Sequence, residues 1–545
     1  MKRIFFIVVF LCVYAGGIFA QNIKNIIFMV PDGASSSSLT LSRWYQIYQN
    51  SNQNSRLAID SLVCGMVKTH SSNAIIGDSA PTMSAYMTGY LSQTQFVSMY
   101  PPKDEHNDLL PIDSERSYSP CITIMEAARI AKNKATGLVF TCEFPHATPA
   151  GTAAHWYNRN NYNAIQTQMI HNSIDVLIGG GVGLLTQEQE MFLKNTGYEV
   201  IKNHLEKFRK SNATKLWALF GEKYIANDWD RDTTKQPSLV EMTKKAINLL
   251  SKNEQGFFLM VEGSKIDWSS HLNDPVGIIS EMLAFDAVVK EVVEFAKTNG
   301  ETLIVICPDH GNGGISIGNS RSDGFYDTLS LKKLMEPLIK CTKTSEFITE
   351  YLTNLPQDSI QPVIQKYWGI SNISSDTIKM IHDAKEIYQQ NLQNQKKKDS
   401  LNGIIAKVLQ SRTYIGFTTH GHTGEDVFLA IYHPQNNRLT GLVTAPEINR
   451  YLCDAIEINS LDDLTNEYYC PVTKIFKEIN FKIESNGQIL KITPRKDEKS
   501  TMIIEANSNQ VRLNQQIFQT KTPAIYVDTI NTWYISRECL GFFNF

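Results

Sequence analysis

Five short apolar runs recur along the first 310 residues and alternate with helical patterns. The runs span residues 25–30, 137–140, 174–178, 256–261 and 302–306. Runs of this length suit strands that are buried on both faces of a parallel sheet. Between them, apolar residues in segments such as 281–296 return every three or four positions, as on one face of a helix. The alternation predicts an α/β fold, a three-layer sandwich with a mostly parallel central sheet.

Two regions depart from this alternation. Residues 321–413 are polar with mostly helical periodicity, and the lysines at 396–398 predict a solvated surface there. From residue 463 onward, short alternating segments separated by Ser-Asn-Gly and Asn-Ser-Asn turns predict a small antiparallel sheet. The expected organisation is a main domain over 21–462 that contains a helical insertion at 321–413, followed by a β-rich addition over 463–545.

The first twenty residues follow the order of a secretory signal peptide. Lys2 and Arg3 precede the apolar run 4–14, and small residues lead to Ala20. We therefore expect an exported protein, periplasmic or secreted. The run is shorter than the roughly 18 residues that a membrane helix needs. The rest of the sequence has no apolar stretch of that length, so no membrane span is expected in the mature chain.

Charge and cysteine usage narrow the function classes. The chain of 545 residues has a formal net charge of −3, and no nucleic-acid-binding surface is expected from this balance. Eight of its nine cysteines lie beyond the signal peptide, without Cys-x-x-Cys spacing. Disulfides are permitted outside the cytoplasm, but the sequence leaves their pairing open.

A serine precedes a predicted helix in the segment 75–90. Asp78 stands before Ser79, and the helical pattern ends at Gly89. The N-terminus of a helix favours a bound phosphate or an alkoxide, because free backbone N–H groups and the positive end of the dipole point there. An Asp-Ser pair before a helix is more often an ordinary N-cap. Ser79 is therefore a candidate nucleophile that needs a base or a metal to activate it.

Three clusters of metal-ligand residues follow predicted strands or lie close together in a later segment. They are Glu262, Asp267 and His271; Asp309 and His310; and His420 and His422. Any one cluster more often consists of solvated surface side chains or contains a hydrogen-bonded core histidine. Strands of a parallel sheet present their carboxyl ends at one edge, where side chains from different strands meet. Imidazole with carboxylate favours zinc, and sets of oxygen ligands favour magnesium.

The motifs around these residues resemble those of the alkaline phosphatases with a serine nucleophile, in the same order. They are PDG (31–33), GDSA (77–80), HATP (146–149), AAHWYNR (153–159), VEGSKID (261–267), PDHG (308–311) and HTGED (422–426). The similarity covers residues 24–322 and 415–435. It implies the alkaline-phosphatase-like sandwich and a phosphate monoester hydrolase that acts through a phosphoserine at Ser79 and releases inorganic phosphate at alkaline pH.

The resemblance also implies a ligand set of two Zn²⁺ and one Mg²⁺. The zinc beside Ser79 would take Asp32, Asp309 and His310. The other zinc would take Asp267, His271 and His422, with His420 as the less favoured alternative to His422. Magnesium would take Asp32, Thr148 and Glu262. Arg159 would bind two phosphate oxygens, a geometry that the planar guanidinium suits.

Two positions depart from the magnesium-dependent bacterial pattern, which has Asp and Lys there. They are His146 and Trp268, and with Asp78 we expect them beside the metals or the substrate. An imidazole at residue 146 makes zinc the alternative ion for the third site. Trp268 fits a substrate contact and plain packing equally well.

Other functions on the same scaffold remain as alternatives. Related phosphodiesterases have a threonine nucleophile, and sulfatases carry a C/S-x-P-x-R signature, whereas residues 79–83 read SAPTM without the arginine. A non-catalytic exported binding protein would have lost ligands, and none is missing. The sequence leaves open the physiological monoester and the oligomeric state, for which a homodimer is one option.

Overall fold

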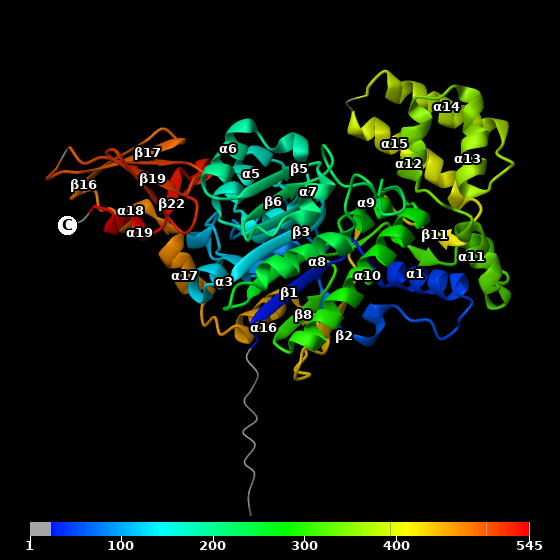
Figure 1. The fold of residues 1–545 in the computed structure, drawn as a ribbon, viewed down its shortest axis with the longest axis horizontal. Coiled ribbons are helices and arrows are strands. Elements are labelled where there is room, and N and C mark those ends of the chain that lie inside the picture. The colour runs from blue at the N-terminus through cyan, green and yellow to red at the C-terminus, as the bar shows by residue number, and fades with distance from the viewer. Residues whose placement is uncertain (1–22, 393, 498, 544–545) are drawn as a thin grey trace, which may run out of the picture.

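The structure is a computed structural model that describes residues 23–392, 394–497 and 499–543, so the expected signal peptide at 1–20 lies outside the described residues. A ten-stranded sheet crosses its middle (Figure 1). In spatial order the strands are β14 (Gly441–Thr444), β2 (Val63–Lys68), β13 (Val427–Tyr432), β8 (Thr302–Ile306), β1 (Asn25–Val30), β7 (Phe257–Glu262), β3 (Ala135–Glu143), β4 (Val176–Gly180), β6 (Leu216–Leu219) and β5 (Glu199–Lys202). Only β13 runs antiparallel to its neighbours in this sheet. The mostly parallel sheet is confirmed.

Each strand in the middle of the sheet is buried on both faces. Along β1, Ile27 and Met29 join one apolar cluster, while Ile26 and Phe28 join another on the opposite face. The first cluster is covered by α1 (Ser36–Gln49), α7 (Leu205–Lys210), α8 (Leu239–Leu250), α9 (Lys265–His271) and α10 (Pro275–Asn299). The second is covered by α2 (Ser79–Thr88), α3 (Ile124–Lys132), α4 (Ala147–Ala153), α5 (Tyr162–His171), α6 (Gln187–Asn195) and α16 (Ala445–Ala455). The three-layer sandwich is confirmed.

The insertion expected at 321–413 is helical and lies at one end of the molecule (Figure 1). Its helices are α11 (Leu331–Ile339), α12 (Ser345–Thr353), α13 (Ile360–Trp368), α14 (Ser375–Gln389) and α15 (Gln395–Gln410). The prediction that all three lysines at 396–398 are solvated is wrong for Lys398. Its ammonium lies 2.7 Å from the Glu350 carboxylate and is buried against α12, while Lys396 and Lys397 are exposed.

The C-terminal region forms two small antiparallel sheets, one of five strands and one of three, at the opposite end, where the sequence predicted a single sheet (Figure 1). It comprises α17 (Leu461–Tyr468), β15 (Cys470–Pro471), α18 (Val472–Ile475), β16 (Phe481–Ser485), β17 (Ile489–Pro494), β18 (Met502–Glu505), β19 (Gln510–Leu513), β20 (Gln516–Gln519), β21 (Ile525–Val527), β22 (Thr532–Ile535) and α19 (Glu538–Gly541). The two sheets share an apolar core around Phe476 and Ile492. The boundary expected at 462/463 stays a prediction, since α17 crosses it.

Two further features of the described residues bear on the expectations. None of their helices combines the length and the apolar character that a membrane crossing requires. The eight cysteines among them are all free thiols, and only Cys64 is not fully buried. The structure therefore contains no disulfide within the described part of the chain.

Candidate active site

Four adjacent parallel strands, β8, β1, β7 and β3, deliver the candidate ligands to one edge of the sheet. Asp32 follows β1, Glu262 ends β7, and Asp309 with His310 follows β8. All four side chains are fully or almost fully buried. Because parallel strands share the direction of their carboxyl ends, residues far apart in sequence converge at this edge.

The remaining histidines reach the edge from two short elements. His271 ends α9, the helix that starts directly after β7 and also carries Asp267. His422 lies on β12 (His422–Thr423), which pairs antiparallel with β9 (Gly311–Asn312) directly after His310. This pairing stacks the rings of His310 and His422 with centroids 3.6 Å apart.

The distances define two overlapping groups of ligand atoms. In the first, His310 Nε2 lies 3.3 Å from Asp309 Oδ2 and 3.7 Å from Asp32 Oδ1. In the second, His271 Nε2 lies 3.3 Å from Asp267 Oδ2 and 3.2 Å from His422 Nε2. His422 Nε2 is 3.7 Å from Asp267 Oδ1. Both groups have the mixed imidazole and carboxylate composition that suits zinc.

Hydrogen bonds to main-chain carbonyls orient the three histidine rings. Nδ1 of His310, His422 and His271 lies 3.1, 3.0 and 2.6 Å from the carbonyl oxygens of Gly311, Gly77 and His420, respectively. Because a carbonyl oxygen only accepts, each Nδ1 donates a hydrogen bond to it. Rings held in this way present Nε2 to the carboxylates and are oriented to bind a metal through that atom.

His420 does not join these groups. Its Nδ1 lies 2.8 Å from the carbonyl oxygen of His271, and its Nε2 lies 3.5 Å from the side-chain amide of Asn273. The structure therefore brings His422, and not His420, to the Asp267 carboxylate. His420 contributes its main-chain carbonyl, which fixes the ring of His271.

A third group of polar atoms includes Glu262 at the same edge of the sheet. Thr148 Oγ1, on α4, and Glu262 Oε1 are buried and have no hydrogen-bond partner among the described residues. An unsatisfied buried polar atom costs about 1–3 kcal/mol, so a bound cation would relieve both. Cys142 Sγ lies 3.4 Å from Glu262 Oε2, and ligand atoms of Cys142, His146 and Glu262 lie within 4.8 Å of one another.

Cys142 is the residue near this site that the sequence motifs missed. The metal-ligand clusters in the sequence consist of histidines and carboxylates, whereas Cys142 stands inside the apolar strand β3, four residues before His146. Its position at the carboxyl end of that strand is the signal that points to it. Its thiol is a candidate soft ligand that favours zinc over magnesium in the third site.

The crowding of carboxylates at the edge calls for compensating positive charge. Burial, followed by the negative charges of Asp309 and Asp267, raises the pKa of Asp32 well above its usual range. Burial likewise raises the pKa of Glu262 to about 7. Burial and then the neighbouring His310 lower the pKa of His422 to about 4. A cation bound among these buried carboxylates would compensate their negative charge and favour their ionised form.

Ser79 is the first residue of α2 and is only 2% exposed. Its hydroxyl oxygen lies 3.2 Å from His310 Nε2, within hydrogen-bonding distance. The hydroxyl of Tyr86, further along α2, donates a 2.8 Å hydrogen bond to the carbonyl of Pro308. That bond fastens the serine helix to the segment that carries Asp309 and His310.

Arg159 pairs with Asp78, the residue that precedes Ser79, through Nη1 and Oδ1. The guanidinium is thus anchored beside the serine with its second amino group free of that contact. Gly33 allows the segment after β1 to approach α9 closely, because a Cβ there would lie 2.5 Å from Asp267 Oδ1. Its φ of +67° also favours glycine.

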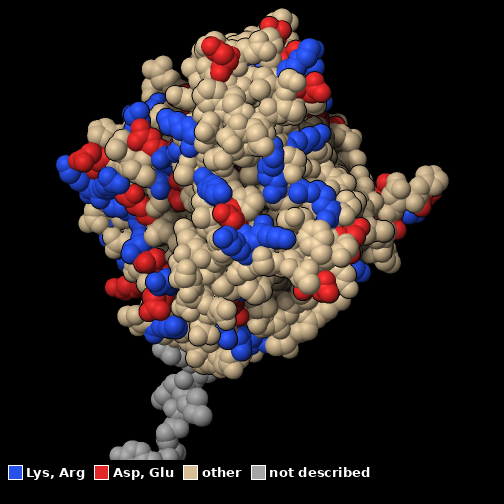
Figure 2. Space-filling model, turned by 90° about the vertical axis from the view of Figure 1, so that its right-hand side faces the viewer, with Lys and Arg blue, Asp and Glu red and all other residues tan. Residues whose placement is uncertain are grey.

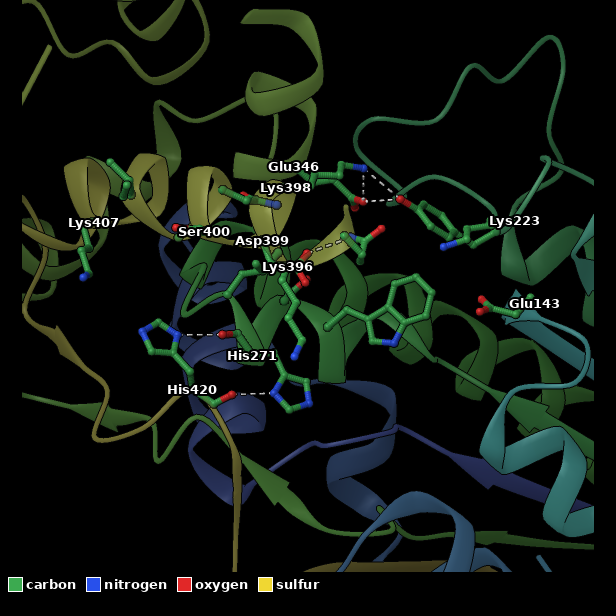
Figure 3. A pocket seen from close by; sticks show the side chains of 18 residues that line it. Glu143, Lys223, His271, Glu346, Lys396, Lys398, Asp399, Ser400, Lys407 and His420 are labelled. Atoms are coloured by element: carbon green, nitrogen blue, oxygen red, sulfur yellow. Dashed lines mark hydrogen bonds and ion pairs between the residues drawn. The ribbon is translucent and has the colours of Figure 1, made fainter. Parts of the chain in front are cut away.

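His146 and Trp268 form one wall of the site. Their rings meet edge to face with centroids 5.7 Å apart. Burial, and then the charge of Arg159, lowers the pKa of His146. Trp268 and His271 also line a cleft of about 610 Å³ that opens toward the helical insertion (Figure 3). All thirteen residues expected at the site lie at or beside this edge of the sheet.

Comparison with known proteins shows the family of the chain. Residues 23–458 match the family model described as alkaline phosphatase. Alkaline phosphatase 3 of Bacillus subtilis (strain 168) is 31% identical over 453 residues, which cover 81% of this chain and 90% of that protein. The crystal structure of a cold-active alkaline phosphatase from the psychrophile Shewanella sp. matches with a TM-score of 0.68 and 27% identity, over 79% of this chain and 99% of that one.

A more distant likeness concerns the fold alone. A histidine-to-aspartate mutant of TAB5 alkaline phosphatase, with magnesium bound in its M3 site, matches with a TM-score of 0.54 and 21% identity over 81% of this chain and 99% of that one. Together with the converged ligand groups, the match over four fifths of the sequence leaves one assignment. The chain belongs to the alkaline phosphatase family.

Proposed function

We propose that this phosphatase hydrolyses phosphate monoesters through a phosphoserine at Ser79, with two zinc ions and one magnesium ion held at the edge of the sheet. Membership of the family supports monoester hydrolysis. The observation that carries the finer proposal is the position of the Ser79 hydroxyl, 3.2 Å from a histidine nitrogen within a buried group of carboxylates. A serine hydroxyl in such surroundings is activated for attack.

The donor sets fit the proposed ions. One zinc would be held by Asp32, Asp309 and His310, the other by Asp267, His271 and His422, and magnesium by Asp32, Thr148 and Glu262. His146 and Cys142 beside the last set make zinc the alternative there. When bound, the zinc pair would stabilise the attacking and leaving oxygens of an in-line displacement and lower the pKa of water.

The chain's own groups supply binding and orientation. Arg159, held by Asp78, grips two nonbridging oxygens of the phosphoryl group, and the N–H groups at the start of α2 face the same charge. Ser79 Oγ forms a bond to phosphorus while the bond from phosphorus to the leaving alcohol breaks. Water then attacks phosphorus and breaks its bond to Ser79, releasing inorganic phosphate and restoring the hydroxyl.

Release of p-nitrophenol from p-nitrophenyl phosphate tests the proposal with the purified, metal-loaded protein. Ser79→Ala should lose nearly all turnover, because the nucleophile is gone. Ser36→Ala is the matched control, since Ser36 is the exposed first residue of α1 and should tolerate the change. Undiminished turnover by Ser79→Ala would remove Ser79 from the mechanism.

The phosphodiesterase alternative is tested on the same protein. We expect p-nitrophenyl phosphate to be hydrolysed faster than bis(p-nitrophenyl) phosphate, because Arg159 and the helix N-terminus suit the two free negative charges of a monoester. Faster hydrolysis of the diester would favour the phosphodiesterase assignment over the monoesterase one. We further propose that the chain is exported, to the periplasm or the medium, and acts there on small-molecule monoesters.

A further inference from the structure

A buried network of charges fastens the helical insertion over the active site. Lys265, two residues before Asp267, places its ammonium 2.7 Å from Glu346 Oε2 on α12. Lys398 on α15 lies 3.6 Å from the other oxygen of the same carboxylate. Tyr224 donates a 2.9 Å hydrogen bond to Glu346 Oε1. The side chains of Lys265, Glu346 and Lys398 are only 1%, 15% and 11% exposed, so the tether is sheltered from water.

The same network fixes two aromatic rings in place. The ammonium of Lys265 lies 4.4 Å from the ring centroid of Tyr224 and 5.5 Å from that of Trp268. The two rings meet edge to face at 5.0 Å. Cation–π contacts of a desolvated lysine hold such rings firmly. Tyr224 and Trp268 therefore form a preorganised apolar wall next to the metal ligand His271.

These rings line the cleft of about 610 Å³, and α15 closes its opposite side (Figure 3). That volume lies within the range of small-ligand sites. The cleft begins at His271, where the leaving group of a phosphate monoester would emerge from the proposed metal site. A leaving group of moderate size therefore has a built space to occupy.

Three lysines that do not belong to this network line the cleft and give it positive charge. Lys223, Lys396 and Lys407 line it and form no ion pair within the described residues. In Figure 3, Lys396 extends from α15 toward the ring of His271, and Lys223 approaches from the opposite side. Such ammonium groups remain available to a ligand.

Two carboxylates outside the network face these lysines in the cleft. Glu143 accepts a 3.1 Å hydrogen bond from the hydroxyl of Tyr162, and Asp399 accepts one of 2.8 Å from the side chain of Gln395. Outside the network, three lysines and two carboxylates line the cleft, so these groups leave it with a net positive charge. On the face that carries the insertion, Lys and Arg side chains gather across the middle (Figure 2), which favours the approach of anions.

We propose that this cleft binds the leaving group of phosphate monoesters that carry a second anionic group, with Lys396 and Lys223 binding that anion and Trp268 packing against the intervening part. The inference rests on the proposed function of the same site and names its preferred substrates: small organic molecules with two phosphates, or a phosphate and another anion.

Two substrates that differ by one phosphate test the cleft in the metal-loaded enzyme. The values of kcat/KM for 1,4-phenylene bisphosphate and phenyl phosphate give a preference ratio, and differences in leaving-group chemistry cancel when variants are compared with wild type. Lys396→Gln should lower this ratio about tenfold, the loss of roughly one charge-assisted contact. Lys397→Gln is the matched control, since Lys397 is exposed on the same helix and does not line the cleft. Its ratio should equal that of wild type.

The outcomes separate the inference from the proposed function. A ratio in Lys396→Gln equal to that of wild type, or a wild type that does not prefer the bisphosphate, overturns the role of the cleft while leaving the proposed function intact. A wild type that hydrolyses neither substrate overturns the proposed function. A preference that weakens as salt is raised supports electrostatic binding, because exposed charges are screened.

Discussion

The rings of His310 and His422 stack with centroids 3.6 Å apart and planes inclined by 20°, although they come from different motifs of the sequence. Two protonated imidazoles would repel each other at this distance, so the arrangement requires that at least one ring is neutral. Burial and the proximity of His310 lower the pKa of His422 to about 4, in keeping with a neutral ring. Nε2 of His310 faces the Asp309 carboxylate and Nε2 of His422 faces that of Asp267, the orientation that metal ligands require.

Replacing His422 should remove a metal ligand, whereas replacing His420 should not. His422→Ala is expected to lower the zinc content by about one ion per chain and to abolish most activity. His420→Ala, the matched control two residues away, retains the carbonyl that holds His271 and should keep both zinc ions. Elemental analysis after gel filtration measures the content. A larger zinc loss in His420→Ala would exchange the two assignments.

Chelation should inactivate the enzyme reversibly. Dialysis against a strong chelator removes the ions from the three groups, leaving buried carboxylates without compensation. We expect activity to return with zinc plus magnesium and not with magnesium alone, because the two imidazole-containing sets favour zinc. Full recovery with magnesium alone would contradict the proposed zinc pair.

Removing the guanidinium of Arg159 should weaken transition-state binding. Arg159→Ala is expected to lower kcat/KM on the order of 100-fold, the usual cost of losing one charged clamp. Arg159→Lys keeps the positive charge but loses the planar pair of N–H donors that can bind two oxygens at once. It should therefore recover only part of that loss. Inhibition by inorganic phosphate should weaken in the same order. Equal kcat/KM for wild type and Arg159→Ala would exclude the residue from phosphate binding.

The tether between Lys265 and Glu346 should matter for stability. Glu346→Gln leaves the ammonium of Lys265 buried without its closest counter-charge, and we expect a loss of about 3 kcal/mol in the free energy of unfolding. Glu350→Gln is the control on the same helix: its side chain is 57% exposed and the change should cost less than about 1 kcal/mol. Urea denaturation followed by fluorescence measures both. Equal costs would argue against a buried tether.

The same pair predicts a pH dependence. Burial works to raise the pKa of Glu346, but Lys265 and Lys398 outweigh it and lower the pKa to about 2. Because the folded value lies below the unfolded value of about 4.3, the stabilisation is complete above that pH and is lost as the pH falls toward 2. The stability difference between wild type and Glu346→Gln should therefore shrink by about 1 kcal/mol between pH 7 and pH 3.5. A constant difference would mean that the carboxylate is not paired.

The central layers of the fold could be predicted from sequence because their strands are buried on both faces. Strand β1, for example, reads as an unbroken apolar run, and its residues divide between the two apolar clusters. Polar residues directly after such runs, including Asp32 and Asp309, then had to meet at one edge of the sheet. Local pattern was sufficient for these features.

Contacts between segments that are distant in sequence were harder to predict from the sequence. The motif context favoured His422 over His420, but the physical reason is the pairing of β12 with β9, two strands of two residues each that leave no periodic signal. Lys398 looked like part of a solvated run, because its partners Glu346 and Glu350 lie on another helix. Cys142 lies within an apolar strand, and only its position at the end of that strand marks it as a candidate metal ligand.

The most direct test of the central claim is to identify the phosphorylated residue. The enzyme is mixed with substrate, quenched in acid, digested and analysed by mass spectrometry, with Ser79→Ala treated in parallel. We predict one phosphoryl group on the peptide that contains Ser79, and none in the variant. A phosphoryl group on another residue, or turnover by wild type without any phosphopeptide at a range of quench times, would contradict the account.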